Sequence, residues 1–183
     1  MIKHLQKSIW VVLLAGMAGC QSGGQKGADV TPFFDLEAFF QGEIGRMEGV
    51  HEVEKKITFN GKTEEQQVKN WDATVEMEGF KELHINRPTW KDQYQIDSLK
   101  GEGGILEGIR YAARDSSLRI RQVEIDWKAG AVEEVRVEKY MKNLIVFFHQ
   151  TLKYRPEEGY SLWRAQKVPL MKRSELGVEV RYH

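Results

Sequence analysis

The most reactive side chain in this chain is the thiol of Cys20, its only cysteine. It follows Lys3 and Lys7, an apolar core at residues 9–15 and the small residues Ala18 and Gly19. A basic start, a short apolar core and small residues at the cut are the pattern of a secretory signal peptide. The sequence therefore predicts export, with cleavage of residues 1–19 leaving Cys20 at the new N-terminus.

The ending Met17-Ala18-Gly19-Cys20 resembles the lipobox of bacterial lipoproteins. The resemblance implies that the Cys20 thiol receives a diacylglyceryl group and that Cys20 becomes the acylated first residue. The membrane would then be a partner through this lipid, and stable anchoring takes two signals, such as two acyl chains. The alternative is an uncleaved spanning helix, which needs about 20 mostly apolar residues. The apolar stretch here is shorter, and polar residues 21–27 follow it.

The charge balance and the cysteine count narrow the function classes. The chain has 27 basic and 27 acidic residues, and cleavage removes two lysines and no acid, which leaves a formal charge of −2. No net positive field would steer phosphates, which argues against nucleic acid as a partner. Because lipid would consume Cys20, the exported part has no thiol for a disulfide, a thiolate metal site or a nucleophile.

Three regions are predicted. Residues 1–19 are the signal peptide, and residues 20–30 are the lipidated cysteine with a flexible Gly, Ser and Gln tether. Residues 31–183 form a single domain of about 150 residues. A domain of this size buries about 68–70% of its unfolded surface and needs no disulfide or metal for stability.

The domain is predicted to begin with an amphipathic helix that has Thr31 as its cap, Pro32 in its first turn and Gly49 at its end. Apolar residues recur at three- and four-residue spacing along it. This stripe is Phe33, Leu36, Phe40, Ile44 and Met47.

A hairpin and a second helix should follow. Residues 52–68 alternate polar and apolar around Asn60-Gly61, a pair that tolerates the positive φ angles of a type I′ turn. The second helix is predicted over residues 70–83 and must stop before Pro88. Its expected cap is Asn70, and its expected core residues are Trp71, Val75, Phe80 and Leu83.

From Trp90 onward, apolar and polar residues alternate with a period of two, which is typical of strands. Strands are predicted at residues 90–96, 105–111, 118–127, 132–141, 144–154, 160–167 and 178–182. Short turns between them favour antiparallel pairing, and a shift of the apolar phase near Gln122 predicts a bulge. The predicted fold class is α+β, with two helices and a strongly curved, mostly antiparallel sheet of about eight strands, like a half-barrel closed over one or both helices.

The sequence offers no strong catalytic motif, and we expect no catalytic, cofactor-binding or metal-binding residues. His51 with Glu52 and Glu54 is a weak metal cluster, because His51 would point away from both carboxylates on a strand. His149 is interpreted as a strand-end histidine facing solvent. The glycines at 101–104 lead into a strand, so no helix dipole would hold a phosphate there.

Charged residues alternate with apolar ones in the predicted strands, which is typical of a solvated sheet face with cross-strand pairs. These residues are Arg119, Arg121, Glu134, Arg136, Glu138, Arg164 and Glu179. Phe34 and Phe39 lie off the stripe of the first helix, and packing needs a stripe of only about 100°. They are interpreted as core residues, and the alternative is an apolar groove for an acyl chain or a partner.

A wider resemblance rests on short motifs spread over residues 31–183. They are Phe33-Phe34-Asp35-Leu36 to Met47, the hairpin at Asn60-Gly61, Trp71 to Phe80, His84-Ile85-Asn86-Arg87-Pro88, and Gly159-Tyr160-Ser161-Leu162 with Gln166. The pattern resembles uncharacterised envelope lipoproteins of the Bacteroidota type, and it implies a lipid-anchored envelope protein of unknown function. In that lineage, acidic residues soon after the cysteine resemble a surface-export signal, and residues 21–25 have none. An aspartate directly after the cysteine resembles an inner-membrane retention signal, and this chain has Gln21 there. This favours the periplasmic face of the outer membrane over the cell surface.

Two function classes remain open. The first is a non-enzymatic binding or interaction module for an apolar ligand or an envelope protein. The second is a hydrolase acting on envelope polymers, which would need a carboxylate pair in a cleft.

The anchor can be tested by Cys20→Ser. Without the thiol the chain should carry no diacylglycerol, so the intact mass should show an unacylated or unprocessed form. The variant should also leave the detergent phase on phase partition. A parent protein whose mature N-terminus carries no lipid would contradict the lipobox interpretation.

Overall fold

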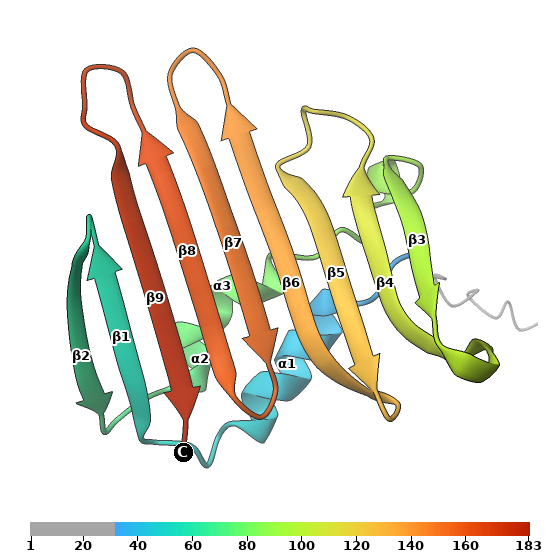
Figure 1. The fold of residues 1–183 in the computed structure, drawn as a ribbon, viewed down its shortest axis with the longest axis horizontal. Coiled ribbons are helices and arrows are strands. Elements are labelled where there is room, and N and C mark those ends of the chain that lie inside the picture. Colours follow the sequence, from blue (N-terminus) through green and yellow to red (C-terminus); the bar gives the residue numbers. More distant parts are fainter. Residues whose placement is uncertain (1–31) are drawn as a thin grey trace, which may run out of the picture. The chain divides into compact units, whose positions relative to one another are not determined.

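The computed structural model describes residues 32–183, so the signal peptide, the tether with Cys20 and the predicted cap at Thr31 lie outside the described residues. The fold is one antiparallel sheet of nine strands, in the order β2-β1-β9-β8-β7-β6-β5-β4-β3, with the helices on one face (Figure 1). The strands are β1 (Val53–Phe59), β2 (Lys62–Val68), β3 (Tyr94–Lys100), β4 (Leu106–Ala113), β5 (Ile120–Lys128), β6 (Ala131–Lys142), β7 (Phe147–Arg155), β8 (Gly159–Lys167) and β9 (Ser174–Tyr182). The helices are α1 (Leu36–Arg46), α2 (Ala73–Glu76) and α3 (Glu78–Lys81).

The predicted antiparallel sheet with few helices is confirmed in outline, and the structure has nine strands where about eight were expected. The sheet dominates the fold and is not closed, because β2 and β3 are its two edges. Edge β2 reads Lys-Thr-Glu-Glu-Gln-Gln-Val, and its charged and polar residues disfavour pairing with another chain. Among residues 32–183, none of the helices has the length and apolar character that crossing a bilayer would require.

The five residues of the predicted apolar stripe are all buried. Helix α1 contains Leu36, Phe40 and Ile44 of this stripe and ends at Arg46, before the predicted Gly49. The helix begins later than predicted, because Asp35 is its cap. The Asp35 carboxylate accepts a hydrogen bond from the Ala38 amide at 3.0 Å. A capping aspartate satisfies an amide that the helix leaves free and lies at the positive end of its dipole.

The hairpin at Asn60-Gly61 is confirmed. Strands β1 and β2 pair from Val53 with Val68 to Phe59 with Lys62. Asn60 and Gly61 have φ angles of 49° and 82°, as a type I′ turn requires.

The predicted second helix is wrong in extent. The structure has two single turns, α2 and α3, that meet at Met77, and the cap is Asp72 rather than Asn70. Val75 is 72% exposed and does not belong to the core, whereas Trp71, Phe80 and Leu83 do. The β-branched Val75 and the flexible Gly79 are poor helix formers, so nothing local extends either turn.

Several strand boundaries differ from the prediction, among them the start of β9 at Ser174 instead of residue 178, and the bulge is confirmed. Trp90 ends a 3₁₀ turn at Pro88–Trp90 instead of starting a strand, because proline fits the first position of such a turn. Strand β7 begins at Phe147, so residues 144–146 form its turn with β6. The pairing of β5 with β6 shifts between Ile120 and Gln122, where the bulge was expected.

Aromatic side chains join the helices to the sheet. Phe40 is fully buried, with its ring centroid 5.3 Å from that of Tyr154 and 5.4 Å from that of Phe80. Phe34 and Phe39 are half-buried, and their rings pack on Trp127 at 5.8 Å and on Tyr154 at 6.0 Å. Their positions off the main stripe are therefore used in packing, which supports the core interpretation over the groove.

The type I′ turn gives a stability test. Gly61→Val places a β-branched side chain at positive φ, which should cost about 1 kcal/mol or more of unfolding free energy. Gly61→Asn is the matched control, because asparagine tolerates this conformation and should cost less. Urea denaturation measures both. Equal midpoints for the two variants would contradict the role of backbone strain at this turn.

Candidate functional site

The face of the sheet opposite the helices, which we call the open face, carries one polar residue from every strand in a single row. The pairing registers align these residues from edge to edge. In spatial order they are Glu65, Lys56, Glu179, Ser161, Lys153, Arg136, Glu124, Arg110 and Asp97. The signs alternate along most of the row, and the alternation breaks where Ser161 is followed by two cations.

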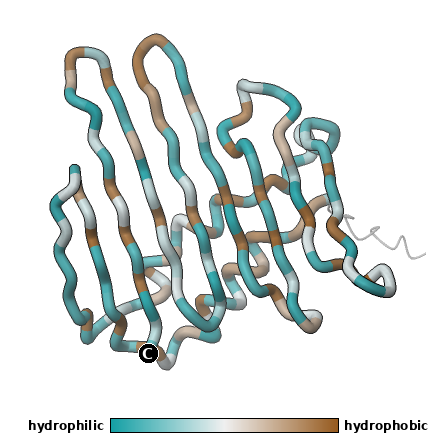
Figure 2. Tube along the Cα trace, viewed as in Figure 1, coloured by the Kyte–Doolittle hydropathy of each residue, from teal (hydrophilic) through white to brown (hydrophobic). Residues whose placement is uncertain are grey.

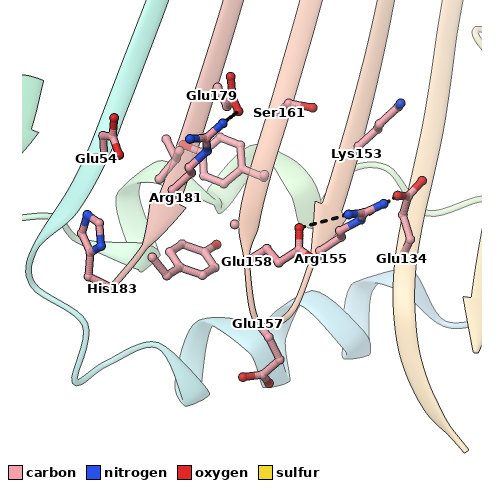
Figure 3. Close-up of a pocket in the computed structure, with 14 residues that line it drawn as sticks. Glu54, Glu134, Lys153, Arg155, Glu157, Glu158, Ser161, Glu179, Arg181 and His183 are labelled. Carbon is pink, nitrogen blue, oxygen red and sulfur yellow. Dashed lines mark hydrogen bonds and ion pairs between the residues drawn. The ribbon is translucent and has the colours of Figure 1, made fainter. Parts of the chain in front are cut away.

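A hollow runs along strand β8 at the point where the alternation of charge in the row is interrupted (Figure 3). Its lower part has a volume of about 720 Å³ and its upper part about 320 Å³, and Lys153, Ser161 and Glu179 line both. The floor includes small residues, with Gly159 and Ser161 on β8 in the lower part and Ser161 with Gly177 on β9 in the upper part. Gly159 has φ +134°, and a Cβ there would lie 1.9 Å from the Val180 carbonyl oxygen. The floor therefore excludes a side chain at that position.

Charged side chains of both signs surround the hollow. Lys56 binds Glu65 at 2.9 Å, and Arg181 binds Glu179 at 2.7 Å. Lys153 is exposed, and within residues 32–183 the structure gives it no ion pair or side-chain hydrogen bond. Lys153 is thus a cation at the centre of the row that is open to an external anionic group.

The carboxylate of Glu134 is the most buried charge of the open face, with 8% of its side chain exposed. Arg136 donates to one of its oxygens, and Arg155 donates to the other at 2.9 Å. Arg136 also binds Glu124 at 2.7 Å. Two guanidinium groups offset the cost of burying this carboxylate, and removal of either one would leave a poorly compensated charge.

Aromatic rings lie at the upper end of the hollow. Trp163 lines it and is 37% exposed, and its ring lies 5.3 Å from that of His149 in an edge-to-face arrangement. The His149 Nε2 atom lies 2.8 Å from a Glu138 oxygen, and Tyr140 packs on the other side at 5.9 Å. His149 lies near the start of β7, as predicted, but its half-buried ring is held between aromatic rings and a carboxylate instead of facing solvent freely.

Among the described acidic residues of the open face, Asp126 has a raised pKa. Asp126 on β5 lies directly opposite Glu134 on β6. Burial, followed by the charges of Glu124 and Glu134, raises the pKa of Asp126 above its ordinary value. A carboxyl group with a raised pKa next to a second carboxyl group is a feature of sites that use acid catalysis.

The predicted solvated face is confirmed for Arg136, Glu138 and Glu179, which are partly exposed. It is wrong for Glu134, which is buried on that face, and for Arg164. Arg164 lies on the helix side, where it donates to Gln150 at 3.1 Å. The weak cluster at His51, Glu52 and Glu54 forms no metal-binding group within the described residues. Residues 102–104 form a 3₁₀ turn between β3 and β4.

The row and the hollow were not predicted from sequence, because both depend on strand register. The available signal was the small residues Gly159, Ser161 and Gly177 within otherwise bulky strands, since such residues often mark a close approach to a strand. Across the chain, no protein-family model, no curated protein and no solved structure gives a match.

Proposed function

We propose that this protein is a lipid-anchored envelope protein that works as a non-enzymatic binding module, and that its open face holds an extended segment of an envelope protein. The observation that carries the proposal is the hollow along β8, with its floor of small residues and the free cation Lys153 beside it. A backbone can approach a strand closely only where side chains are small. An acidic side chain of the partner would complete the charge pattern at Lys153.

The walls of the hollow favour an extended polar partner. Glu179 and Arg181 line one side and Lys153 and Arg155 the other, so charges of both signs follow the strand direction. Complementary charges set the register and the choice of partner more than the raw affinity. Trp163 at the upper end offers a half-exposed ring, and tryptophan is enriched among the residues that dominate binding energy.

An apolar ligand between helix and sheet has less support. It was motivated by Phe34 and Phe39, and both rings pack against other aromatic side chains of the core. We therefore place the binding surface on the open face rather than beneath α1.

A hydrolase acting on envelope polymers is the second candidate, and Asp126 with Glu134 is the observation that favours it. Asp126 would be the acid, because its pKa is raised. Both oxygens of Glu134 already accept from arginines, which leaves that carboxylate poorly placed to activate water. The pair thus supports catalysis less well than the hollow supports binding.

The binding proposal is tested by photo-crosslinking in the native envelope. A photoreactive residue at Ser161 should capture one envelope protein, and the same residue at exposed Val75 should not. Lys153→Glu should reduce the yield at Ser161 by about 5- to 10-fold, because it reverses the charge that faces the partner. Lys62→Glu, at the edge of the sheet and on the helix side, is the matched control and should leave the yield unchanged. Capture of no protein at Ser161 would contradict the proposal.

The carboxylate pair is tested by Asp126→Asn. A raised pKa means that the folded state binds this proton more tightly, so the stabilisation is present below pH 3.8 and is lost as pH rises through the folded pKa. Asparagine removes the like-charge pair, so unfolding free energy at pH 7 should rise by about 0.2–1 kcal/mol, with little change at low pH. Urea denaturation at both pH values checks this. A stable variant that loses a polymer hydrolysis shown by the parent would favour the enzyme instead.

A further inference from the structure

Two neighbouring turns carry exposed apolar side chains at the upper edge of the sheet. They are the β6–β7 turn at residues 143–146 and the β8–β9 loop at residues 168–173, and both extend beyond the other connections (Figure 1). Figure 2 shows apolar colour at both tips. The exposed side chains are Leu144 (97%), Ile145 (71%), Leu170 (108%) and Met171 (67%).

The register places the two turns side by side. Strand β7 pairs with β6 on one side and with β8 on the other, and its first residue, Phe147, lies opposite both Lys142 and Lys167. The guanidinium of Arg173 lies 5.7 Å from the centroid of the Phe147 ring, so it connects the β8–β9 loop to β7. The four apolar side chains therefore belong to one surface, which we call the tip surface.

Both turns are held in shape by hydrogen bonds. The Asn143 side chain accepts from the amides of Ile145 at 2.9 Å and Val146 at 2.8 Å. The Met171 amide donates to the Val168 carbonyl at 3.0 Å. The backbone that carries the tip surface is thus preformed, which reduces the ordering cost of binding.

Leu170 is an unfavourable residue for the backbone conformation of its turn. Its φ angle is +66°, in the left-handed region that favours glycine or asparagine. Either of these residues would relieve the strain and also remove a fully exposed leucine. A strained and exposed apolar residue in a turn is the kind of outlier that indicates a function.

The charges beside the tips are mostly positive, although Glu175 pairs with Arg173 at 2.9 Å at the end of the β8–β9 loop. Across residues 142–146 and 167–173 there are four basic residues, Lys142, Lys167, Lys172 and Arg173, and no acidic residue. The chain as a whole has equal numbers of basic and acidic residues, so this edge is a local excess of positive charge. Apolar side chains surrounded by lysine and arginine are the composition of surfaces that insert into the boundary of an anionic bilayer.

We infer that the tip surface binds the surface of an anionic lipid bilayer. Leu144, Ile145, Leu170 and Met171 enter the acyl boundary, and the long basic side chains reach the phosphate headgroups. This contact goes beyond the proposed function and does not require the lipid on Cys20. It would give the domain a fixed orientation at the membrane, which attachment through a single residue does not provide.

The test uses the full chain with Cys20→Ser, which leaves no other cysteine. Leu144→Cys, Leu170→Cys and the control Val75→Cys each receive the same environment-sensitive fluorophore. Vesicles of phosphatidylethanolamine with phosphatidylglycerol are compared with vesicles of phosphatidylcholine. Residues 1–30 are identical in all three proteins, so any binding through them contributes equally, and only the position of the probe differs.

Probes at positions 144 and 170 should show blue-shifted emission on the anionic vesicles and a smaller shift on the neutral ones, with no shift at position 75. Lys142→Gln with Lys172→Gln should raise the lipid concentration for half-maximal shift by about 10-fold or more, since each basic residue near the surface contributes. Lys62→Gln with Lys91→Gln is the control and should change little. Leu170→Asn should keep the fold, because asparagine accepts positive φ, and should weaken the shift at position 144.

Three results would overturn the inference. The first is no shift at either tip. The second is an equal shift at all three positions, which would indicate general adsorption. The third is a shift without vesicles that grows with protein concentration, which would indicate that a second copy of the chain covers the tips. None of these results bears on capture of a partner at Ser161, so the inference and the proposed function fail separately.

Discussion

The contact on which the fold depends is the packing of helix α1 against the middle strands of the sheet. Phe40 is fully buried between Tyr154 on β7 and Phe80 on α3, and the Tyr154 hydroxyl donates to Glu43 of the same helix at 2.5 Å. A similar contact holds α2, where Glu76 accepts from Tyr160 on β8 at 2.9 Å and pairs with Lys55 on β1 at 2.8 Å. A nine-stranded sheet has two faces to satisfy, and these short helices cover one of them. The opposite face must therefore be stable in water.

That requirement explains the chemistry of the open face. Cross-strand neighbours on a solvated face stabilise a sheet when their charges are opposite, and most of the row from Glu65 to Asp97 obeys this rule. The exceptions are informative, because alternating charge would place a basic side chain at position 161 and an acidic one at position 153. The sequence has serine and lysine there, and glycine at 159 is fixed by backbone contact. The hollow therefore lies at the point where the face departs from what its own stability favours.

The sequence predicts the local features of this fold well and its long-range features poorly. The hairpin at Asn60-Gly61 and the bulge near Gln122 follow from backbone preference and from a shift in period, both of which are local. Helix α1 follows from its apolar stripe, whereas its cap is set by the geometry of Asp35. The second helix was overestimated because Val75 fits the spacing of a core residue while adding little helical preference. The row, the hollow and the opposition of Asp126 to Glu134 depend on register across several strands, which no single segment encodes.

The tip surface illustrates the same limit in a different way. Residues 144–148 read as one apolar run, and a continuous apolar run is the expected sign of a buried strand. Asn143 ends that pattern by binding the amides of the turn, so the first two apolar residues are exposed and the later ones enter β7. Near the tips, the helices do not cover the helix side of the sheet, and its own side chains do so. The Arg164 guanidinium lies 5.5 Å from the centroid of the Phe148 ring and donates a hydrogen bond to Gln150. Because β8 runs from the hollow toward the β8–β9 loop, a bilayer bound at the tips would leave the hollow facing sideways, so that a partner in the same membrane could lie along it.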